Sequence, residues 1–217
     1  MIVAIGLFPG FTALDAVGPY QVFINLPGAE VVLCAAEPGI VPDDNALLHL
    51  RVDAKFDDVP RPDLVLVPGG PATRRLARDG HPIVDWVRQA HPHTRWTTSV
   101  CTGALILGAA GILRGLPATT HWCAYDLLAG HGAHPTEQRV VRSGRIVTGA
   151  GVSAGIDLAL SVVVDVAGPE VAQAIQLGLE YDPQPPVDAG APSKAPVAVY
   201  ELVAERLATV GAGALSS

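Results

Sequence analysis

The chain has 217 residues and carries 14 Lys and Arg against 21 Asp and Glu, a formal net charge of −7. This acidic balance, without a Lys- or Arg-rich cluster, argues against nucleic acid as a partner, because a phosphate backbone requires a basic surface. No apolar run approaches the roughly 20 residues of a membrane span, so we expect no membrane association. The length suits one substantial core, and we therefore expect a single domain over residues 1–217.

Short runs of Val, Ile and Leu alternate with longer segments of helical spacing. This pattern predicts an α/β fold, a single-domain sandwich of a mostly parallel β-sheet flanked by helices, of flavodoxin-like type. Hairpins are predicted over residues 138–148, around Ser143-Gly144, and over Gly39–Leu50. The remaining predicted strands are Ile2–Leu7, Glu30–Ala35, Leu64–Val67 and Arg95–Thr98, with Ile146–Thr148 as the second strand of the first hairpin.

Helices are predicted between these strands, with Thr12 and Ser153 at N-cap positions. Their ranges are Thr12–Leu26, Ile83–Ala90, Gly103–Ala110, Trp122–Leu128, Ser153–Val166, Glu170–Leu179 and Val197–Val210. Residues 182–196 form a Pro-rich loop before the last helix, since prolines exclude a regular helix or a central strand. A loop of this length is either a surface connector or a functional lid or subunit contact.

The cysteine at position 101 lies between a strand-like run and a Gly/Ala-rich helical run. This is the setting of the nucleophile elbow of hydrolases. The N-terminus of the following helix is expected to stabilise a thiolate there. The alternative is that Cys101 is a buried small hydrophobic residue.

The three cysteines, Cys34, Cys101 and Cys123, form an odd set without C-x-x-C spacing. Neither a disulfide framework nor a zinc site is indicated, and a reducing, cytoplasmic compartment is expected. Cys34 and Cys123 are interpreted as packing residues. The run Met1–Leu7 has no basic n-region and is interpreted as a core strand, not as a signal peptide.

Ligands of open α/β sheets bind beyond the carboxyl ends of the strands. Asp15 follows the first strand and is the only acid among the first 29 residues. We expect a carboxyl group in an apolar cleft, its pKa raised by burial, that moves a proton beside Cys101. The alternative is an ordinary first-turn acid that balances the helix dipole.

Three further elements of the candidate site are predicted. After the third strand, Gly69-Gly70 would allow close backbone approach, with the Gly70 N–H as an oxyanion donor, unless the pair is only a tight turn. Thr102 would present its N–H to the same point and its hydroxyl to Asp15 or a water molecule, the alternative being local capping. His121 is the best placed of the seven histidines, although a satisfied polar or surface histidine is the competing interpretation.

Several motifs along the chain are informative together, namely 11–15 (FTALD) with Gly18-Pro19, 67–70 (VPGG), 99–104 (SVCTGA), 118–122 (ATTHW), 151–157 (GVSAGID) and 180–186 (EYDPQPP). On these motifs, and over nearly its whole length, the chain resembles the ThiJ/PfpI superfamily of the class I glutamine-amidotransferase-like fold. Within it, the set Asp15, Cys101, Thr102 is similar to that of the isonitrile hydratases. The resemblance implies hydration of a small-molecule isonitrile to an N-substituted formamide, no metal or organic cofactor, and a homodimer.

The chain also departs from the broader superfamily, whose members usually carry Glu at the position of Asp15. Protease-like and amidotransferase-like branches place a histidine beside the cysteine, whereas Thr102 stands here, which disfavours a Cys–His hydrolytic mechanism. Two alternatives remain. One is a glyoxalase-like or other small-electrophile hydratase on the same site. The other is a non-catalytic ligand or redox sensor in which Cys101 is oxidised.

Overall fold

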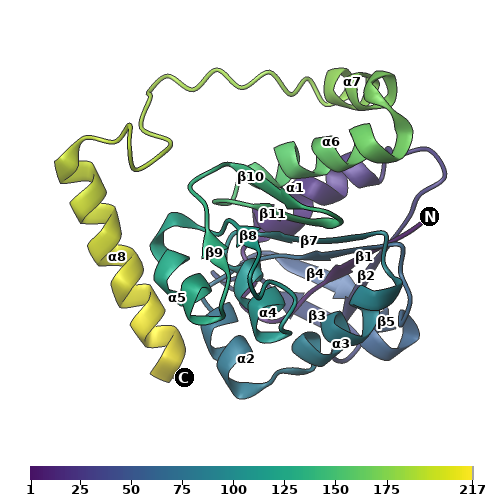
Figure 1. Ribbon diagram of the computed structural model, residues 1–217, viewed down its shortest axis with the longest axis horizontal. Coiled ribbons are helices and arrows are strands. Elements are labelled where there is room, and N and C mark those ends of the chain that lie inside the picture. The colour runs from purple at the N-terminus through teal and green to yellow at the C-terminus, as the bar shows by residue number, and fades with distance from the viewer. Residues whose placement is uncertain (217) are drawn as a thin grey trace.

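The computed structural model describes the backbone of residues 1–216 and the side chains of residues 1–209. Within this range the chain forms a seven-stranded sheet in the order β10-β11-β7-β6-β1-β2-β5 (Figure 1). Neighbouring strands are parallel except β10, which is antiparallel to β11. The predicted α/β fold is therefore confirmed. The strands are β1 (Ile2–Gly6), β2 (Glu30–Ala35), β5 (Ala54–Lys55), β6 (Leu64–Val67), β7 (Trp96–Val100), β10 (Val140–Ser143) and β11 (Ile146–Gly149).

Helices cover both faces of the sheet (Figure 1). On one face α1 packs against α6, which in turn packs against α7; on the other, α4 contacts α2, α3 and α5. Their bounds are α1 (Ala13–Phe23), α2 (Thr73–Asp79), α3 (Pro82–Ala90), α4 (Gly103–Ala109), α5 (Tyr125–Gly130), α6 (Ala154–Ala167) and α7 (Pro169–Gly178). All four residues of β6 are buried. A strand covered on both faces shows this continuous apolar pattern, which is why it was recognisable in the sequence.

Three predicted helices differ from the structure by more than one residue at an end. The last, predicted to end at Val210, runs from Val197 to Ser216. The first ends at Phe23 instead of Leu26, because the chain turns there and buries Leu26 in the core. The predicted helix over 122–128 is instead a 3₁₀ turn, η3 (Trp122–Ala124), followed by α5. The His121 side chain accepts the Cys123 N–H and so begins this tighter turn.

Short elements account for the other differences. The predicted second hairpin is confirmed as β3 (Gly39–Pro42) paired with β4 (His49–Val52). The short elements that were not predicted are the helix α2, the two-residue strands β5, β8 (Pro117–Ala118) and β9 (His134–Pro135), and the 3₁₀ turns η1 (Phe56–Asp58) and η2 (His91–His93). Thr12 and Ser153 do precede α1 and α6, but neither side chain caps its helix. Thr12 donates to Asp44, and Ser153 accepts from Arg139.

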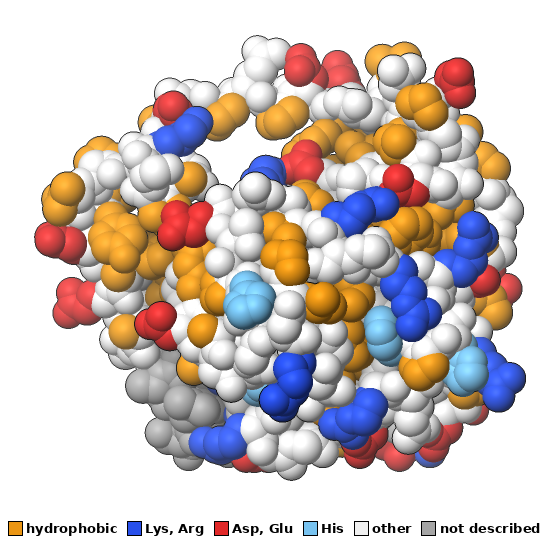
Figure 2. Space-filling view, viewed as in Figure 1, with side chains coloured by type: hydrophobic (Ala, Val, Ile, Leu, Met, Phe, Trp, Pro, Cys, Tyr) orange, Lys and Arg blue, Asp and Glu red, His pale blue; other side chains and the backbone are white. Residues whose placement is uncertain are grey.

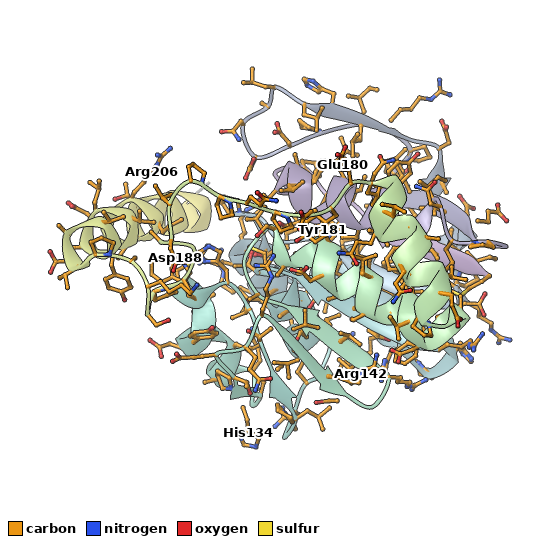
Figure 3. The ribbon with its side chains drawn as sticks, turned by 90° about the horizontal axis from the view of Figure 1, so that it is seen from above. His134, Arg142, Glu180, Tyr181, Asp188 and Arg206 are labelled. Carbon is orange, nitrogen blue, oxygen red and sulfur yellow. The ribbon has the colours of Figure 1, made fainter. Side chains whose placement is uncertain are left out.

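The last helix, α8 (Val197–Ser216), is joined to α7 by a long connecting segment. Figure 3 follows this segment from Glu180 and Tyr181, beside α6, past Asp188 to α8. The segment stands away from the body and leaves an open gap in the space-filling view (Figure 2). α8 contacts α2 and η3, with the rings of Tyr200 and Trp122 at 5.2 Å between centroids. Among the described residues, no helix has both the length and the hydrophobicity needed to cross a bilayer.

Candidate active site

Cys101 forms a strained turn directly between β7 and α4. Its φ is +55°, a left-handed conformation that non-glycine residues rarely adopt and that costs about 1–3 kcal/mol. The surrounding backbone holds it there. The Cys101 N–H donates to the carbonyls of Gly149 and Ala150 at 3.0 and 2.8 Å, and its carbonyl accepts the Thr120 hydroxyl at 2.9 Å. The cysteine is thus presented at the carboxyl edge of the sheet, as the sequence predicted.

Three adjacent strands bring the candidate residues together. β1, β6 and β7 are neighbours in the sheet, and Asp15, Gly69 and Cys101 each follow one of them. The Gly69 N–H donates to Asp15 Oδ2 at 2.8 Å. A Cβ atom on Gly69 would lie 2.6 Å from the Thr102 nitrogen and 2.8 Å from both Asp15 Oδ2 and Cys101 Cβ. No side chain fits there, so glycine is what lets these groups approach one another.

The Asp15 carboxyl group is fully buried. Its Oδ1 has no hydrogen-bond partner among the described residues, while Oδ2 accepts the Gly69 N–H. Burial raises the pKa of Asp15 from 3.8 to about 7, against the opposing effects of the Gly69 hydrogen bond and of the neighbouring Cys101 thiol. This carboxyl group therefore exchanges a proton near neutral pH, which an exposed first-turn acid would not do.

The Cys101 thiol is also held in its neutral form. Burial, followed by the charge of Asp15, raises its pKa well above the ordinary value, and the Thr102 N–H opposes this rise. The expectation that the following helix stabilises a thiolate is wrong, because α4 has only seven residues and desolvation outweighs its effect. The site instead pairs a thiol with a carboxyl group able to accept its proton.

The structure corrects the predicted roles of Thr102 and Gly70. The Thr102 hydroxyl accepts the Gly70 N–H and donates to the Gly70 carbonyl, both at 3.0 Å. It does not bond to Asp15, and the Gly70 N–H is occupied by Thr102 instead of being free as an oxyanion donor. Gly70 has φ +146°, and a Cβ there would lie 2.3 Å from the Gly10 carbonyl oxygen. The backbone N–H of Thr102 is the donor directed at Cys101.

With this geometry established, comparison with known proteins identifies the chain's relatives. Residues 1–165 match the DJ-1/PfpI family. The chain belongs to this family. A Pseudomonas putida member named isonitrile hydratase is 44% identical over 203 residues, which cover 93% of this chain and 88% of that protein.

Two further relatives extend the comparison within the DJ-1/PfpI family. A solved ThiJ/PfpI family protein from Pseudomonas syringae superposes with a TM-score of 0.93 at 38% identity, covering 99% of this chain and 89% of that one. A glutathione-independent glyoxalase from Caenorhabditis elegans is 29% identical over 154 residues, 70% of this chain and 77% of that protein. The resemblance inferred from the sequence motifs is thereby confirmed.

The remaining residues of interest surround Cys123. His121 is half-buried, and its Nδ1 lies 3.1 Å from Cys123 Sγ, so the ring is directed at this second cysteine. Arg74 Nη2 donates to the same sulfur at 3.5 Å. Cys123 therefore has polar contacts that the packing interpretation did not anticipate, whereas Cys34 is fully buried in β2 as expected.

One functional neighbour was missed altogether. Thr120 is fully buried and holds the carbonyl of Cys101, but no sequence signal links residues 19 positions apart. Its position in the motif 118–122 (ATTHW) is the only hint.

Among the described residues, no group of three or more His, Cys, Asp or Glu side chains is arranged to hold a metal ion.

Proposed function

We propose that this protein hydrates organic isonitriles to N-substituted formamides, with Cys101 as nucleophile and Asp15 as proton carrier. The observation that carries the proposal is the buried pair of thiol and carboxyl group, in which the pKa of Asp15 is about 7. The 44% identity to the Pseudomonas putida isonitrile hydratase supports the choice of substrate. The fold alone would not identify the substrate, since one fold hosts many reactions.

The first half of the reaction forms a bond between sulfur and carbon. The terminal carbon of R–N≡C must accept a nucleophile and then gain a proton on that same atom. Asp15 takes the thiol proton as Cys101 Sγ attacks, and it returns this proton to the carbon, which gives the thioimidate R–N=CH–S–Cys101. The step adds S–H across one carbon and leaves Asp15 ionised for the next step.

The second half adds water and releases the product. Asp15 removes a proton from the attacking water and passes it to the nitrogen, which gives R–NH–CH(OH)–S–Cys101. The C–S bond then breaks, its electron pair returns to sulfur, and the hydroxyl proton regenerates the thiol as R–NH–CHO leaves. The Thr102 N–H would polarise the intermediate, while Gly69 and Gly70 position Asp15 and Thr102. His121 would line the approach to the site.

Cys101→Ala tests this scheme, with Cys123→Ser as the matched control that removes a thiol elsewhere. Production of N-cyclohexylformamide from cyclohexyl isocyanide should fall at least about a thousandfold in Cys101→Ala. It should stay close to wild type in Cys123→Ser. Full activity in Cys101→Ala would exclude the covalent mechanism, and mass spectrometry of the wild-type protein during turnover should detect the Cys101 adduct.

A second candidate activity is hydration of a small carbonyl electrophile such as methylglyoxal. The observation in its favour is the 29% identity to the Caenorhabditis elegans glyoxalase. Parallel kcat/KM measurements on cyclohexyl isocyanide and methylglyoxal discriminate between the two. A higher value for methylglyoxal would replace the isonitrile assignment.

We further propose that the protein acts as a homodimer in the cytoplasm. The homodimer is carried over from the superfamily resemblance. The compartment is supported by the cysteines, since Cys34, Cys101 and Cys123 are all free thiols, as proteins of reducing compartments usually have.

A further inference from the structure

Cys123 has a setting that differs from an ordinary packed cysteine. It lies in η3 and is partly exposed. Its sulfur is 3.1 Å from His121 Nδ1 and 3.5 Å from Arg74 Nη2. The proposed hydration of isonitriles uses none of these contacts, although it places His121 beside the approach to Cys101.

The hydrogen bonds define where the thiol proton goes. The Cys123 N–H donates to His121 Nδ1 at 3.4 Å, so this nitrogen acts as an acceptor. Burial, with a smaller contribution from Arg74, lowers the pKa of His121, which keeps the ring neutral at neutral pH. The thiol therefore donates its proton to Nδ1, while the guanidinium of Arg74 donates to the sulfur. A base and a cation on one thiol are the two groups that activate a nucleophilic cysteine.

The same cysteine lines a cavity of about 640 Å³ between α2, α4, α5 and α8. Apolar side chains form most of its wall, including Leu105, Trp122 and Leu127. Arg74 and Arg78 supply positive charge, and none of the described side chains that line it is acidic. Asp15 and Cys101 do not line this cavity. Its size is that of a small-molecule site, and its lining favours a ligand with an apolar body and a negative charge.

We propose that Cys123 is a second reactive thiol beside the hydration site, and that it forms covalent adducts with small disulfides and electrophiles that have an apolar body and a negative charge. With a disulfide, His121 Nδ1 takes the thiol proton as Cys123 Sγ attacks one of the two sulfurs. A new S–S bond forms, the original S–S bond breaks, and the departing thiolate keeps its electron pair. Cys34 and Cys101 are only 0% and 6% exposed, so neither competes for the reagent.

Labelling with dithiobis(nitrobenzoate), an aromatic disulfide that carries carboxylates, tests the reactivity. The folded wild-type protein is treated with less than one equivalent of reagent, and the adduct is located by peptide mass spectrometry. We expect Cys123 to react at least about tenfold faster than Cys101 or Cys34, and Cys123→Ser to lose the fast phase. A fast phase located at Cys101 or Cys34 would overturn the proposal.

The preference for an anion is tested by substitution of Arg74. Arg74→Gln should slow labelling by dithiobis(nitrobenzoate) about three- to tenfold more than labelling by the uncharged disulfide dithiodipyridine. Arg88→Gln is the matched control, because it removes the same charge from α3, where Arg88 pairs with the exposed Asp85. Equal slowing of both reagents by Arg74→Gln, or an equal selective effect of Arg88→Gln, would show that the cavity does not select anions.

Discussion

Cys101 and Cys123 place the same functional group in opposite surroundings. Cys101 is buried beside a carboxyl group, and its thiol stays protonated until Asp15 accepts the proton. Cys123 is partly exposed beside an imidazole and a guanidinium. The neighbouring groups, more than the thiol itself, decide the chemistry. A carboxyl partner suits proton return to carbon, whereas a neutral base with a cation suits attack on an electrophile that needs no proton.

The largest expected effect is on proton transfer from the Cys101 thiol to Asp15, a step that Cys123 does not share. Asp15→Asn keeps an oxygen for the Gly69 N–H but cannot accept the Cys101 proton, so kcat for isonitrile hydration should fall about 10²- to 10⁴-fold. Labelling of Cys123 should be unchanged, since Asp15 does not line its cavity. Steady-state kinetics and labelling rates measure both quantities. A kcat within a factor of about three of wild type would remove Asp15 from the proton path.

The same substitution should change how stability depends on pH. Folding raises the pKa of Asp15 from 3.8 to about 7, so above pH 4 the unfolded chain ionises more readily than the folded one. Wild-type stability is therefore progressively lost between about pH 4 and 7, by up to about 4 kcal/mol, and then levels off. Asp15→Asn does not lose stability in this way, because the asparagine side chain does not ionise. Its free energy of unfolding relative to wild type should increase from pH 4 to pH 8 in urea titrations.

A pH-independent difference between the two proteins would contradict the raised pKa of Asp15. Ionisation of the Cys101 thiol does not interfere with this comparison of the two proteins between pH 4 and 8. Its pKa is raised above an ordinary value of 9.0, so its contribution falls at more alkaline pH.

The smallest effect concerns the strained turn that distinguishes Cys101 from Cys123. Thr120→Val removes the hydroxyl bonded to the Cys101 carbonyl and should cost about 1–3 kcal/mol of stability, with reduced hydration activity. Thr119→Val is the matched control, because the buried Thr119 hydroxyl has no partner among the described residues. In thermal unfolding, Thr119→Val should leave the stability of the protein unchanged or raise it slightly. Equal effects of the two substitutions would show that Thr120 does not support the turn.

The elements that could be predicted from the sequence are mainly the strands buried on both faces, because their residues form continuous apolar runs. β1 and β6 are continuous apolar runs, and their ends set the positions of Asp15 and Gly69. Cys101 was recognisable because a strand and a small-residue helix flank it directly. Two-residue strands such as β8 leave no periodic pattern, and the 3₁₀ turn at Trp122 depends on a bond from its own backbone to His121.

The parts that were not predicted depend on contacts between distant segments. Thr102 bonds to Gly70, and Thr120 to Cys101, only because the fold brings their loops together. The protonation of Cys101 required knowing how deeply it is buried, since a local rule about helix ends gave the wrong direction. Cys123 was assigned to packing for the same reason, because Arg74 approaches it from another helix.

The connecting segment before α8 gives the Cys123 cavity an unusual property. Tyr181 fixes the start of this segment by donating to Asp157, and the Tyr200 ring packs at a tilt against Trp122 near the start of α8. Leu207 and Ala208 of α8 complete the wall of the cavity. α8 is thus a part of the cavity wall held by a covalent tether, and the length of a tether sets the effective concentration of the segment it carries. The wall beside Cys123 is therefore completed by a helix that a long segment joins to the body, whereas the Cys101 site is built on the ends of the sheet strands.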